Sequence, residues 1–431
     1  MRLMMHRSKV DAGASRPPPK VLPPISLASR PDISPPPAKR RRLSQPAASL
    51  APSLPSRLIS PLGPNQLRIF AWNVNGIAPF LQPAITTFFS PSKKKVRTPP
   101  LSPIISSVTS APAPLPSRSL ASCSLRDCLQ RWQYPQIVCL QEVKIARKDT
   151  KTQNAVSVAV RAPSLRSKAT GEGGKGEGEP GYIARFGLPR DRHNAKGFGG
   201  KVYGVCTLIR KDFMDRECED GDAQEVDWDL EGRVLKLEVR KRKLVIFNVY
   251  AVNGTENAWR DSKTGEVLGT RFDRKRAFHT ELASACAGYE AKGWNVMIAG
   301  DINIARSPLD GYPGRRMGEQ HIRSRQDFEE KFMTGGLAMR DSYREVRGNE
   351  RKYSYRSRGV EWGSSCDRVD LILASRGLHG LVEADILDEE AERGPSDHCP
   401  LYVTLDLEVG EEREGVTTRK PEPSINQSFP D

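Results

Sequence analysis

The chain has 431 residues, with 67 Lys and Arg against 52 Asp and Glu, so its formal net charge is 67 − 52 = +15 at pH 7. Only 37% of the residues are apolar and 34 are proline, which excludes a single folded unit spanning the whole chain. No apolar run reaches the length of about 18 residues that a transmembrane helix needs, and the opening MRLMMHRSKV lacks the apolar core of a secretory signal. The eight cysteines show no zinc-site spacing, so we expect a soluble intracellular protein with reduced, mostly buried cysteines and no membrane partner.

Residues 1–64 hold eleven Lys and Arg, two Asp and Glu and fourteen prolines. This composition cannot bury enough apolar surface to offset chain entropy, and it predicts a disordered basic tail. The basic run at 39–42 is typical of a nuclear localisation signal, so we predict a nuclear protein; a merely solvated charge run is the alternative explanation. Because Asp11 is the first acid, a mitochondrial presequence is a second alternative.

A second segment, 89–122, holds five Lys and Arg, no acid and seven prolines, and predicts a disordered insertion. The segment 148–180 ends in GEGGKGEGEPG and predicts a flexible surface loop, and 411–431 predicts a disordered C-terminal tail. Removing the two basic segments leaves a charge of 15 − 9 − 5 = +1 for the other 333 residues, so the folded part is nearly neutral; we expect it to span 65–410. The total charge is therefore no evidence for a basic cleft.

Short β-type runs recur along the folded part, and several are apolar enough to be buried on both faces. Two runs separated only by Lys241 and Arg242 predict a hairpin and therefore antiparallel pairing. Helical patterns lie between the strands, over 271–291 and from Ser324 to a stop at Gly335. These elements predict stacked β-sheets with helices on the outer faces. The runs are 67–74, 136–143, 202–210, 234–240, 243–250, 295–303, 368–375 and 401–409.

Polar side chains follow the ends of these runs. Asn73 and Asn75 come at a spacing of two, so both side chains point to one side of the strand. Asp301 and Asn303 repeat this spacing at the end of NVMIAGDIN. Asp370 lies inside an apolar run, where a carboxylate needs a partner.

Glu142 ends the second run, and the pair Asp397-His398 precedes the last one. Acids, amides and one histidine at strand ends fit a site for a hard cation and for proton transfer. Each residue also has a structural explanation: Asp-Asn pairs form turns, and Asp370 could pair with Arg368 or Arg376 instead of the histidine. The joint occurrence of these residues in order favours the catalytic interpretation.

The strand-end residues lie in the segments WNVNG (72–76), CLQEVK (139–144), EGRVLKLEV (231–239), NVYAVNG (248–254), GDINIA with PLD (300–310), YSYRSRG (353–359), RVDLILAS (368–375) and PSDHCP (395–400). In this order, the segments resemble the exonuclease III-type apurinic/apyrimidinic endonucleases of the endonuclease/exonuclease/phosphatase superfamily, which also contains DNase I. The segments EGRV, YSYRSRG and PSDHCP favour the exonuclease III branch. The resemblance implies a DNase I-like, four-layered α/β sandwich over 65–410, with two packed mixed β-sheets flanked by helices.

The resemblance also implies a divalent-metal phosphodiesterase that uses Mg²⁺, with Mn²⁺ as a substitute. Glu142 would be the principal metal ligand, with Asn73 and Asp397 near the same ion or its waters. Asp301 would activate or orient the attacking water, and Asn303 would hold that water or a phosphate oxygen. The residues expected near the metal are Asn73, Glu142, Asp301, Asn303, Asp397 and His398.

By the same resemblance, His398, oriented by Asp370, would stabilise the negative charge that develops on the phosphate. Whether Asp301 or His398 is the general base stays open. Tyr250 would address the phosphate or the leaving group. The residues expected to contact substrate are Asn75, Asn253, Tyr355 and Arg356.

The expected reaction is hydrolysis 5′ to an abasic site in duplex DNA during base excision repair, by a monomer that also trims 3′ ends. Alternatives are a tyrosyl-DNA phosphodiesterase, an RNA nuclease, a phosphoinositide phosphatase or a non-catalytic nucleic-acid-binding module. Asp367 stands where the family has the wall of the abasic-sugar pocket, and Trp362, Tyr353 or Tyr355 could supply an aromatic surface instead. Phosphodiester hydrolysis is therefore better supported than abasic-site specificity.

Overall fold

The structure, a computed structural model, describes residues 59–81, 124–161, 179–196, 202–219 and 221–408. The predicted insertion at 89–122, the predicted tail at 411–431 and residues 1–58 lie outside the described residues. The helices are α1 Leu125–Arg131, α2 Thr150–Ala159, α4 Lys211–Glu217, α5 Arg271–Glu290, α6 Glu319–Phe328, α7 Ser342–Arg347 and α8 Glu390–Arg393, with the 3₁₀ turns η1 Ala78–Phe80, η4 Arg240–Arg242 and η5 Pro308–Asp310 and the π-helix η6 Glu329–Thr334. The strands are β1 Gln66–Asn73, β2 Ile137–Gln141, β3 Tyr182–Gly187, β4 Val205–Arg210, β5 Ala223–Glu225, β6 Val234–Val239, β7 Leu244–Tyr250, β8 Ala258–Arg260, β9 Val267–Thr270, β10 Asn295–Asp301, β11 Gly311–Tyr312, β12 Arg340–Asp341, β13 Tyr355–Arg356, β14 Cys366–Asp367, β15 Asp370–Ala374, β16 Leu381–Ile386 and β17 Leu401–Asp406.

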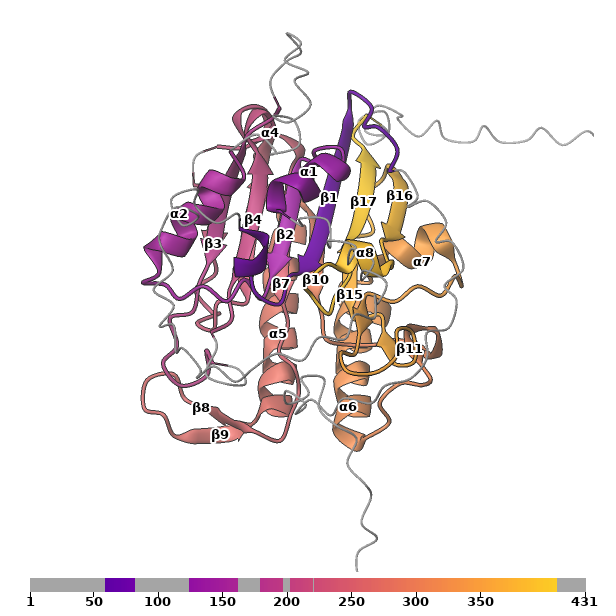
Figure 1. Ribbon diagram of the computed structural model, residues 1–431. Coiled ribbons are helices and arrows are strands. Elements are labelled where there is room, and N and C mark those ends of the chain that lie inside the picture. Colours follow the sequence, from indigo (N-terminus) through magenta and orange to yellow (C-terminus); the bar gives the residue numbers. More distant parts are fainter. Residues whose placement is uncertain (1–58, 82–123, 162–178, 197–201, 220, 409–431) are drawn as a thin grey trace, which may run out of the picture.

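Two mixed six-stranded sheets organise these strands. The first has the order β16-β17-β1-β2-β4-β3, and its strands lie side by side across the view in Figure 1. The second has the order β12-β15-β10-β7-β6-β5. In each sheet one parallel pair, β1 with β2 or β10 with β7, is flanked by antiparallel neighbours. The predicted hairpin is confirmed as the antiparallel pair β6 and β7.

The alternation of buried side chains along the strands produces four layers. In β1, Leu67, Ile69 and Ala71 point into a core that also contains residues of β6, β7, β10 and β15, so this core lies between the sheets. Phe70 and Trp72 point the other way and pack with residues of α1 and α2. The outer face of the second sheet packs with α5, α6 and η6. The predicted four-layered sandwich of two sheets flanked by helices is confirmed.

The predicted loop over 148–180 is wrong for its first part, because residues 150–159 form α2. Asp149 caps this helix by accepting a hydrogen bond of 3.0 Å from the backbone N–H of Thr152. Within α2 only Val156 is buried, so the segment carries no apolar stripe that sequence reasoning could detect. The tail predicted over 1–64 also ends too late, because Ile59 is buried in the cluster that includes α1.

The helix predicted over 271–291 is confirmed as α5, which begins with a capping box between Thr270 and Asp273. The helix predicted from Ser324 begins five residues earlier, at Glu319, because its first turn is polar and gives no apolar signal. The predicted stop at Gly335 is confirmed as the residue that ends η6. Of the helices in the described ranges, none combines the length and apolar character that crossing a membrane requires.

A buried ion cluster fixes the loop before β15 to the second sheet. The Arg368 guanidinium is 1% exposed and donates to Asp310 at 2.7 Å and to Asp341 at 2.7 and 3.1 Å. Burial alone would raise the pKa of Asp310, but Arg368 and Arg344 hold it well below its usual value. Arg368 is therefore committed to these two acids and is not the partner of Asp370.

We expect Arg368→Met to lower the free energy of unfolding by about 3–5 kcal/mol, because it leaves two buried carboxylates without their main partner. Urea denaturation monitored by circular dichroism measures this change. The matched control is Arg323→Met, which removes an exposed pair with Glu319 and should cost about 0.5 kcal/mol or less. Equal effects of the two substitutions would contradict this role of Arg368.

Candidate active site

Five strand ends meet at one edge of the two sheets. Because β1 and β2 run parallel, Asn73 and Glu142 leave the first sheet at the same edge. In the second sheet, Asp301 at the end of β10 pairs directly with Asp370 at the start of β15. His398 lies just before β17, the antiparallel neighbour of β1. The strand-end residues predicted from the sequence therefore come together.

The backbone is unusual at this edge. Asn75, Glu142 and Asn303 have positive φ angles of 50°, 50° and 56°. Asn tolerates this region, but Glu does so rarely, and such conformations concentrate at functional sites. Gly300 has φ 144°, and a Cβ there would lie 2.1 Å from a β7 carbonyl oxygen and 2.9 Å from the side-chain nitrogen of Gln141. Only glycine fits here, between the neighbouring strand β7 and the Gln141 side chain that comes from the first sheet.

Asn73 joins the two sheets through its buried amide. Its Nδ2 donates to Glu142 Oε1 at 3.1 Å and to Asp301 Oδ2 at 2.9 Å. Its Oδ1 accepts a hydrogen bond of 3.0 Å from the backbone N–H of Asn75. A single amide therefore holds an acid that follows β2 and an acid that ends β10 on either side of the interface between the sheets.

His398 lies between the buried carboxylates of Asp370 and Asp301. Its Nδ1 is 2.7 Å from Asp370 Oδ2, and its Nε2 is 4.0 Å from Asp301 Oδ2. Burial raises the pKa of Asp301 and the charge of Asp370 raises it further, although His398 opposes this shift. Burial alone would lower the pKa of His398, but Asp370 raises it to about 10. The imidazole is therefore a cation at neutral pH.

Asn303 is held firmly against Asp301. Its backbone N–H donates to Asp301 Oδ1 at 2.9 Å, and its side-chain Nδ2 donates to the carbonyl of Ala251 at 3.0 Å. Lys275 of α5, 3% exposed, donates to the carbonyl oxygen of Asn303 at 2.8 Å. Burial lowers the pKa of Lys275 to about 7, although Asp301 opposes the shift. A buried amine thus supports the loop that carries Asn303.

Oxygen ligands suited to a hard cation lie around Glu142. Its side chain is 18% exposed, and its Oε2 is 3.0 Å from the ammonium of Lys144. Lys144 also contacts Asn75 Oδ1, and Asn75 Nδ2 donates to Asp397 Oδ1 at 2.7 Å. Burial alone would raise the pKa of Glu142, but Lys144 and neutral hydrogen-bond donors lower it. These carboxylate and amide oxygens already bind the Lys144 ammonium, and oxygen ligands of this kind fit a divalent cation such as Mg²⁺.

Asp301, Asp370 and His398 form a second group, whose potential ligand atoms all lie within 4.8 Å of one another. His398 Nδ1 is already bonded to Asp370, whereas carboxylate and amide oxygens, the ligands that a hard cation prefers, surround Glu142. The donor chemistry therefore favours Glu142 for the cation and this group for proton transfer. Metal roles for Asp301, Asn303 and His398 stay predictions.

Two tyrosines border the site. Tyr250 is 6% exposed and its hydroxyl hydrogen bonds to Glu142. The ring of Tyr355 lies 5.0 Å from the His398 ring, centroid to centroid. Asn253, the other predicted contact in this region, is half-buried in the loop after β7.

Arg356 differs from the other predicted substrate contacts. Its guanidinium bonds to Asp388 at 3.1 Å and to Cys366 Sγ at 3.2 Å, and it stacks on Trp362 at 4.3 Å from the ring centroid. Its backbone N–H donates to the carbonyl of Asp397 at 3.0 Å. The Arg356 backbone is therefore bonded to the site, but its side chain points away from the site towards Asp388 and Trp362.

Sequence reasoning missed the two lysines and a polar bridge. Gln141 Nε2 donates to Asn248 Oδ1 at 2.8 Å, and Asn248 Nδ2 donates to the carbonyl of Cys206 at 3.0 Å, so β2, β4 and β7 are linked across the core. Polar residues inside apolar runs were an available signal for this bridge. Lys144 and Lys275 gave no such signal, because a lysine beside an acid or in a helix usually faces solvent.

The sequence pattern of the Endonuclease/Exonuclease/phosphatase family matches residues 70–398, and the chain belongs to this family. Among solved structures, an AP endonuclease from Archaeoglobus fulgidus is 18% identical, with a TM-score of 0.46 and coverage of 79% of this chain and 99% of that chain. The Xenopus laevis APE2 catalytic domain is 18% identical, with a TM-score of 0.48 and coverage of 79% and 92%. The 3′ phosphatase NExo from Neisseria, bound to product DNA hairpin, is 18% identical, with a TM-score of 0.46 and coverage of 79% and 99%. A comparison with curated proteins found no match.

We expect Asp370→Asn to lower the pKa of His398 from about 10 towards its ordinary value, because the charge that stabilises the imidazolium is removed. NMR titration of the His398 ring protons measures the shift. The internal control is His279, whose pKa burial lowers to about 4 and which should not change. A His398 that still titrates near pH 10 in the variant would show that Asp370 is not its main partner.

Proposed function

We propose that this family member is a divalent-metal-dependent phosphodiesterase that hydrolyses DNA 5′ to an abasic site, with 3′-end trimming as a secondary activity. The observation that carries this proposal is the assembly at one sheet edge, where Asn73 joins Glu142 to Asp301. A cation-binding carboxylate, a raised-pKa carboxylate and an oriented imidazolium are the groups that phosphodiester hydrolysis needs. The exonuclease III-type segments EGRV, YSYRSRG and PSDHCP support the choice of abasic DNA.

Asp301 is the general base in this mechanism. Its pKa is raised above that of an ordinary carboxylate, which suits a group that must take a proton from water near neutral pH. Asn303 and Asn73 both donate hydrogen bonds to this carboxylate and fix its orientation. His398 cannot take the same role, because Asp370 keeps it protonated.

His398 instead donates a hydrogen bond from Nε2 to a phosphate oxygen and stabilises the negative charge that grows there. Its Nδ1 is occupied by Asp370, so only Nε2 faces the reacting group. Asp370 is thus a positioning residue, and it also maintains the positive charge. Tyr250, whose hydroxyl hydrogen bonds to Glu142, would turn this hydroxyl to the same phosphate when substrate is bound.

Glu142, with Asn73 and Asp397 close by, would hold Mg²⁺ or Mn²⁺. The bound cation would supply Lewis-acid polarisation of a phosphate oxygen. Lys144 would then shift from Glu142 towards solvent or the substrate, because its ammonium contacts the same oxygen set. These ligands are all oxygen atoms, as a hard cation prefers.

The segment EGRV has a structural role that supports Tyr250. Glu231 receives hydrogen bonds from Arg233, Arg271 and Arg274. The Arg233 guanidinium then lies 4.8 Å from the centroid of the Tyr250 ring. The EGRV motif therefore positions Tyr250, which faces the site. This role is a reason for the motif to occur in a phosphodiesterase of this branch.

We further propose that the protein acts in the nucleus, because the basic run at 39–42 is typical of a nuclear localisation signal, with mitochondria as the alternative location. A fluorescent fusion with these four basic residues replaced by Ala would separate the two locations. Loss of nuclear signal would support import through this run, and unchanged nuclear signal would contradict it.

We expect the protein to incise an abasic duplex in Mg²⁺, with EDTA abolishing the reaction. Asp301→Asn should lower kcat by about 10²–10⁴-fold because the base is lost. Gel assays of labelled duplexes measure both effects, and Asp215→Asn, at an exposed pair on α4, is the control that should keep full activity. Incision of a 5′-tyrosyl or RNA substrate without abasic incision would refute the substrate, and an active Asp301→Asn variant would refute the base.

We expect Glu142→Gln to raise the Mg²⁺ concentration for half-maximal activity by about tenfold or more, because a neutral amide binds a hard cation less strongly. Isothermal titration of Mn²⁺ gives a readout that does not depend on catalysis. Glu266→Gln, at an exposed position in the β8–β9 hairpin, is the matched control. Unchanged cation affinity in Glu142→Gln would place the metal elsewhere.

A further inference from the structure

Tyr203 lies two residues before β4 and is half-buried beside Tyr250. Its ring meets the Tyr250 ring edge to face, with the centroids 5.6 Å apart and the planes at 60°. Because β4 belongs to the first sheet and β7 to the second, this contact joins the two sheets. Tyr203 is therefore next to a residue of the site, although it precedes a strand instead of following one.

Both tyrosine rings contact the same buried cation. The Cζ atom of Arg233 lies 4.1 Å from the centroid of the Tyr203 ring and 4.8 Å from that of the Tyr250 ring. These distances are within the range of cation–π attraction, which increases when the cation is removed from water. Arg233 is 2% exposed, and its Nε donates to Glu231 at 2.8 Å. The guanidinium is thus a fixed point to which both rings are attracted.

The backbone beside Tyr203 contacts the loop that carries Glu142. The carbonyl oxygen of Gly204 accepts a hydrogen bond of 3.0 Å from the backbone N–H of Val143, the residue that follows Glu142. Gly204 has φ 115°, a conformation that favours glycine. Tyr203 and Gly204 together therefore contact the Glu142 loop and the Tyr250 ring, the two partners of one hydrogen bond at the site.

The Tyr250 ring lies in a small apolar cluster. In the described ranges, this cluster holds only two other buried residues, Val205 and Leu235, with Tyr203 packed against them. Apolar packing has little directionality, so a cluster of this size restricts the ring less than a large core would. The direction of the Tyr250 hydroxyl therefore depends on the contacts of the ring with Arg233 and Tyr203.

We propose that Tyr203 is a positioning residue, whose ring acts with Arg233 to hold the Tyr250 hydroxyl at Glu142. The inference rests on the proposed phosphodiesterase function, in which this hydroxyl turns to the phosphate. Tyr203 itself touches no reacting atom, so its effect on the reaction passes through Tyr250. Both contacts that Tyr203 makes there use its ring, so the ring is required and the Tyr203 hydroxyl is not.

Substitutions that remove or keep the ring test this role. Tyr203→Leu should lower kcat about tenfold and leave KM within about twofold, because the interaction lost is made in the transition state and not with bound substrate. Tyr203→Met also lacks a ring and should give the same result, whereas Tyr203→Phe should retain kcat within about twofold. Rates are measured on whichever of the abasic, 5′-tyrosyl and RNA substrates the unaltered protein cleaves fastest.

The matched control is Tyr289→Leu. Tyr289 near the end of α5 is also half-buried, has the Lys236 ammonium 5.5 Å from its ring centroid, and meets Phe247 edge to face at 5.9 Å. Because these neighbours have no assigned role at the site, the substitution should leave kcat within about twofold. Urea unfolding curves of all variants identify any loss of fold.

A double-mutant cycle separates positioning from general destabilisation. Tyr250→Phe keeps the ring and removes the hydroxyl that Tyr203 is proposed to hold. In this background Tyr203→Leu should change kcat by less than about twofold, because the group that it positions is absent. A loss of about tenfold in both backgrounds would overturn the proposal, since Tyr203 would then act by another route.

The same assays distinguish failure of this role from failure of the proposed function. Equal kcat values for Tyr203→Leu and the unaltered protein would overturn the positioning role and leave the proposed function standing. Failure of the unaltered protein to cleave any of the three substrates would instead refute the phosphodiesterase function, and this role with it.

Discussion

Two carboxylates, Asp301 and Asp370, face each other on adjacent strands of the second sheet, and both are buried. Like charges directly opposite on a sheet repel, and burial increases the cost, so the arrangement requires a cation between them. His398 supplies it from a loop that the first sheet holds in place. Trp72 Nε1 donates to the carbonyl of His398 at 2.9 Å, and the hydroxyl of Ser396 donates to the carbonyl of Asn73 at 2.6 Å. The loop that carries His398, the residue that neutralises the acidic pair, is therefore hydrogen bonded to β1.

The same constraint determines how the two sheets meet. Most of the contact between them is apolar and would tolerate sliding, because apolar packing has little directionality. The amide of Asn73 and the bridge from Gln141 to Asn248 are directional, and both lie near the site. Gly300 permits the close approach that these bonds need. The separation of Glu142 and Asp301, on which the proposed metal-assisted attack on a phosphate depends, therefore follows from hydrogen bonds buried in the core.

The eight predicted strands correspond to eight observed strands because each is a continuous apolar run buried in the sheet interior. β3 and β16 escaped prediction because they lie at the edges of the first sheet, where half-exposed positions interrupt the apolar pattern. The strand-end residues of the site were predictable, since spacing and position alone indicate which side chains share an edge. The roles of Lys144 and Lys275 and the direction of the Arg356 side chain were not predictable. They depend on which surfaces the tertiary fold brings together.

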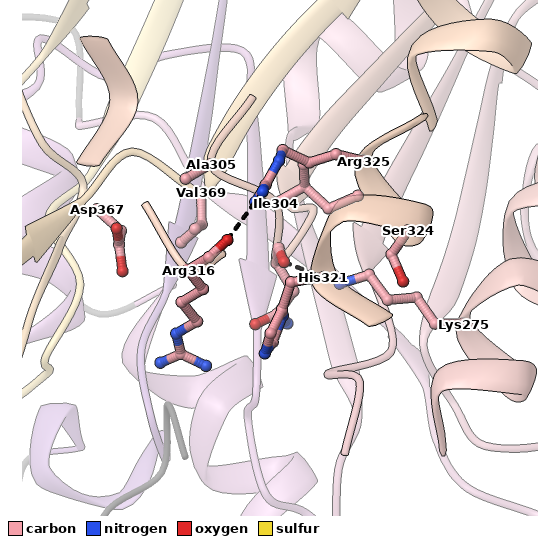
Figure 2. Close-up of a pocket in the computed structure, with 10 residues that line it drawn as sticks. Lys275, Ile304, Ala305, Arg316, His321, Ser324, Arg325, Asp367 and Val369 are labelled. Atoms are coloured by element: carbon pink, nitrogen blue, oxygen red, sulfur yellow. Dashed lines mark hydrogen bonds between the residues drawn. The ribbon is translucent and has the colours of Figure 1, made fainter. Parts of the chain in front are cut away.

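Net charge and local potential are separate properties of this chain. In the described ranges several arginines form ion pairs with buried acids, as Arg368 does with Asp310 and Asp341. Such pairs contribute to stability and cancel at a distance. Lys275, Arg316 and Arg325 line one pocket beside the catalytic edge (Figure 2), so a nearly neutral folded part still gathers basic side chains at one place. The sum of charges along the chain therefore says little about the electrostatic potential at the catalytic edge.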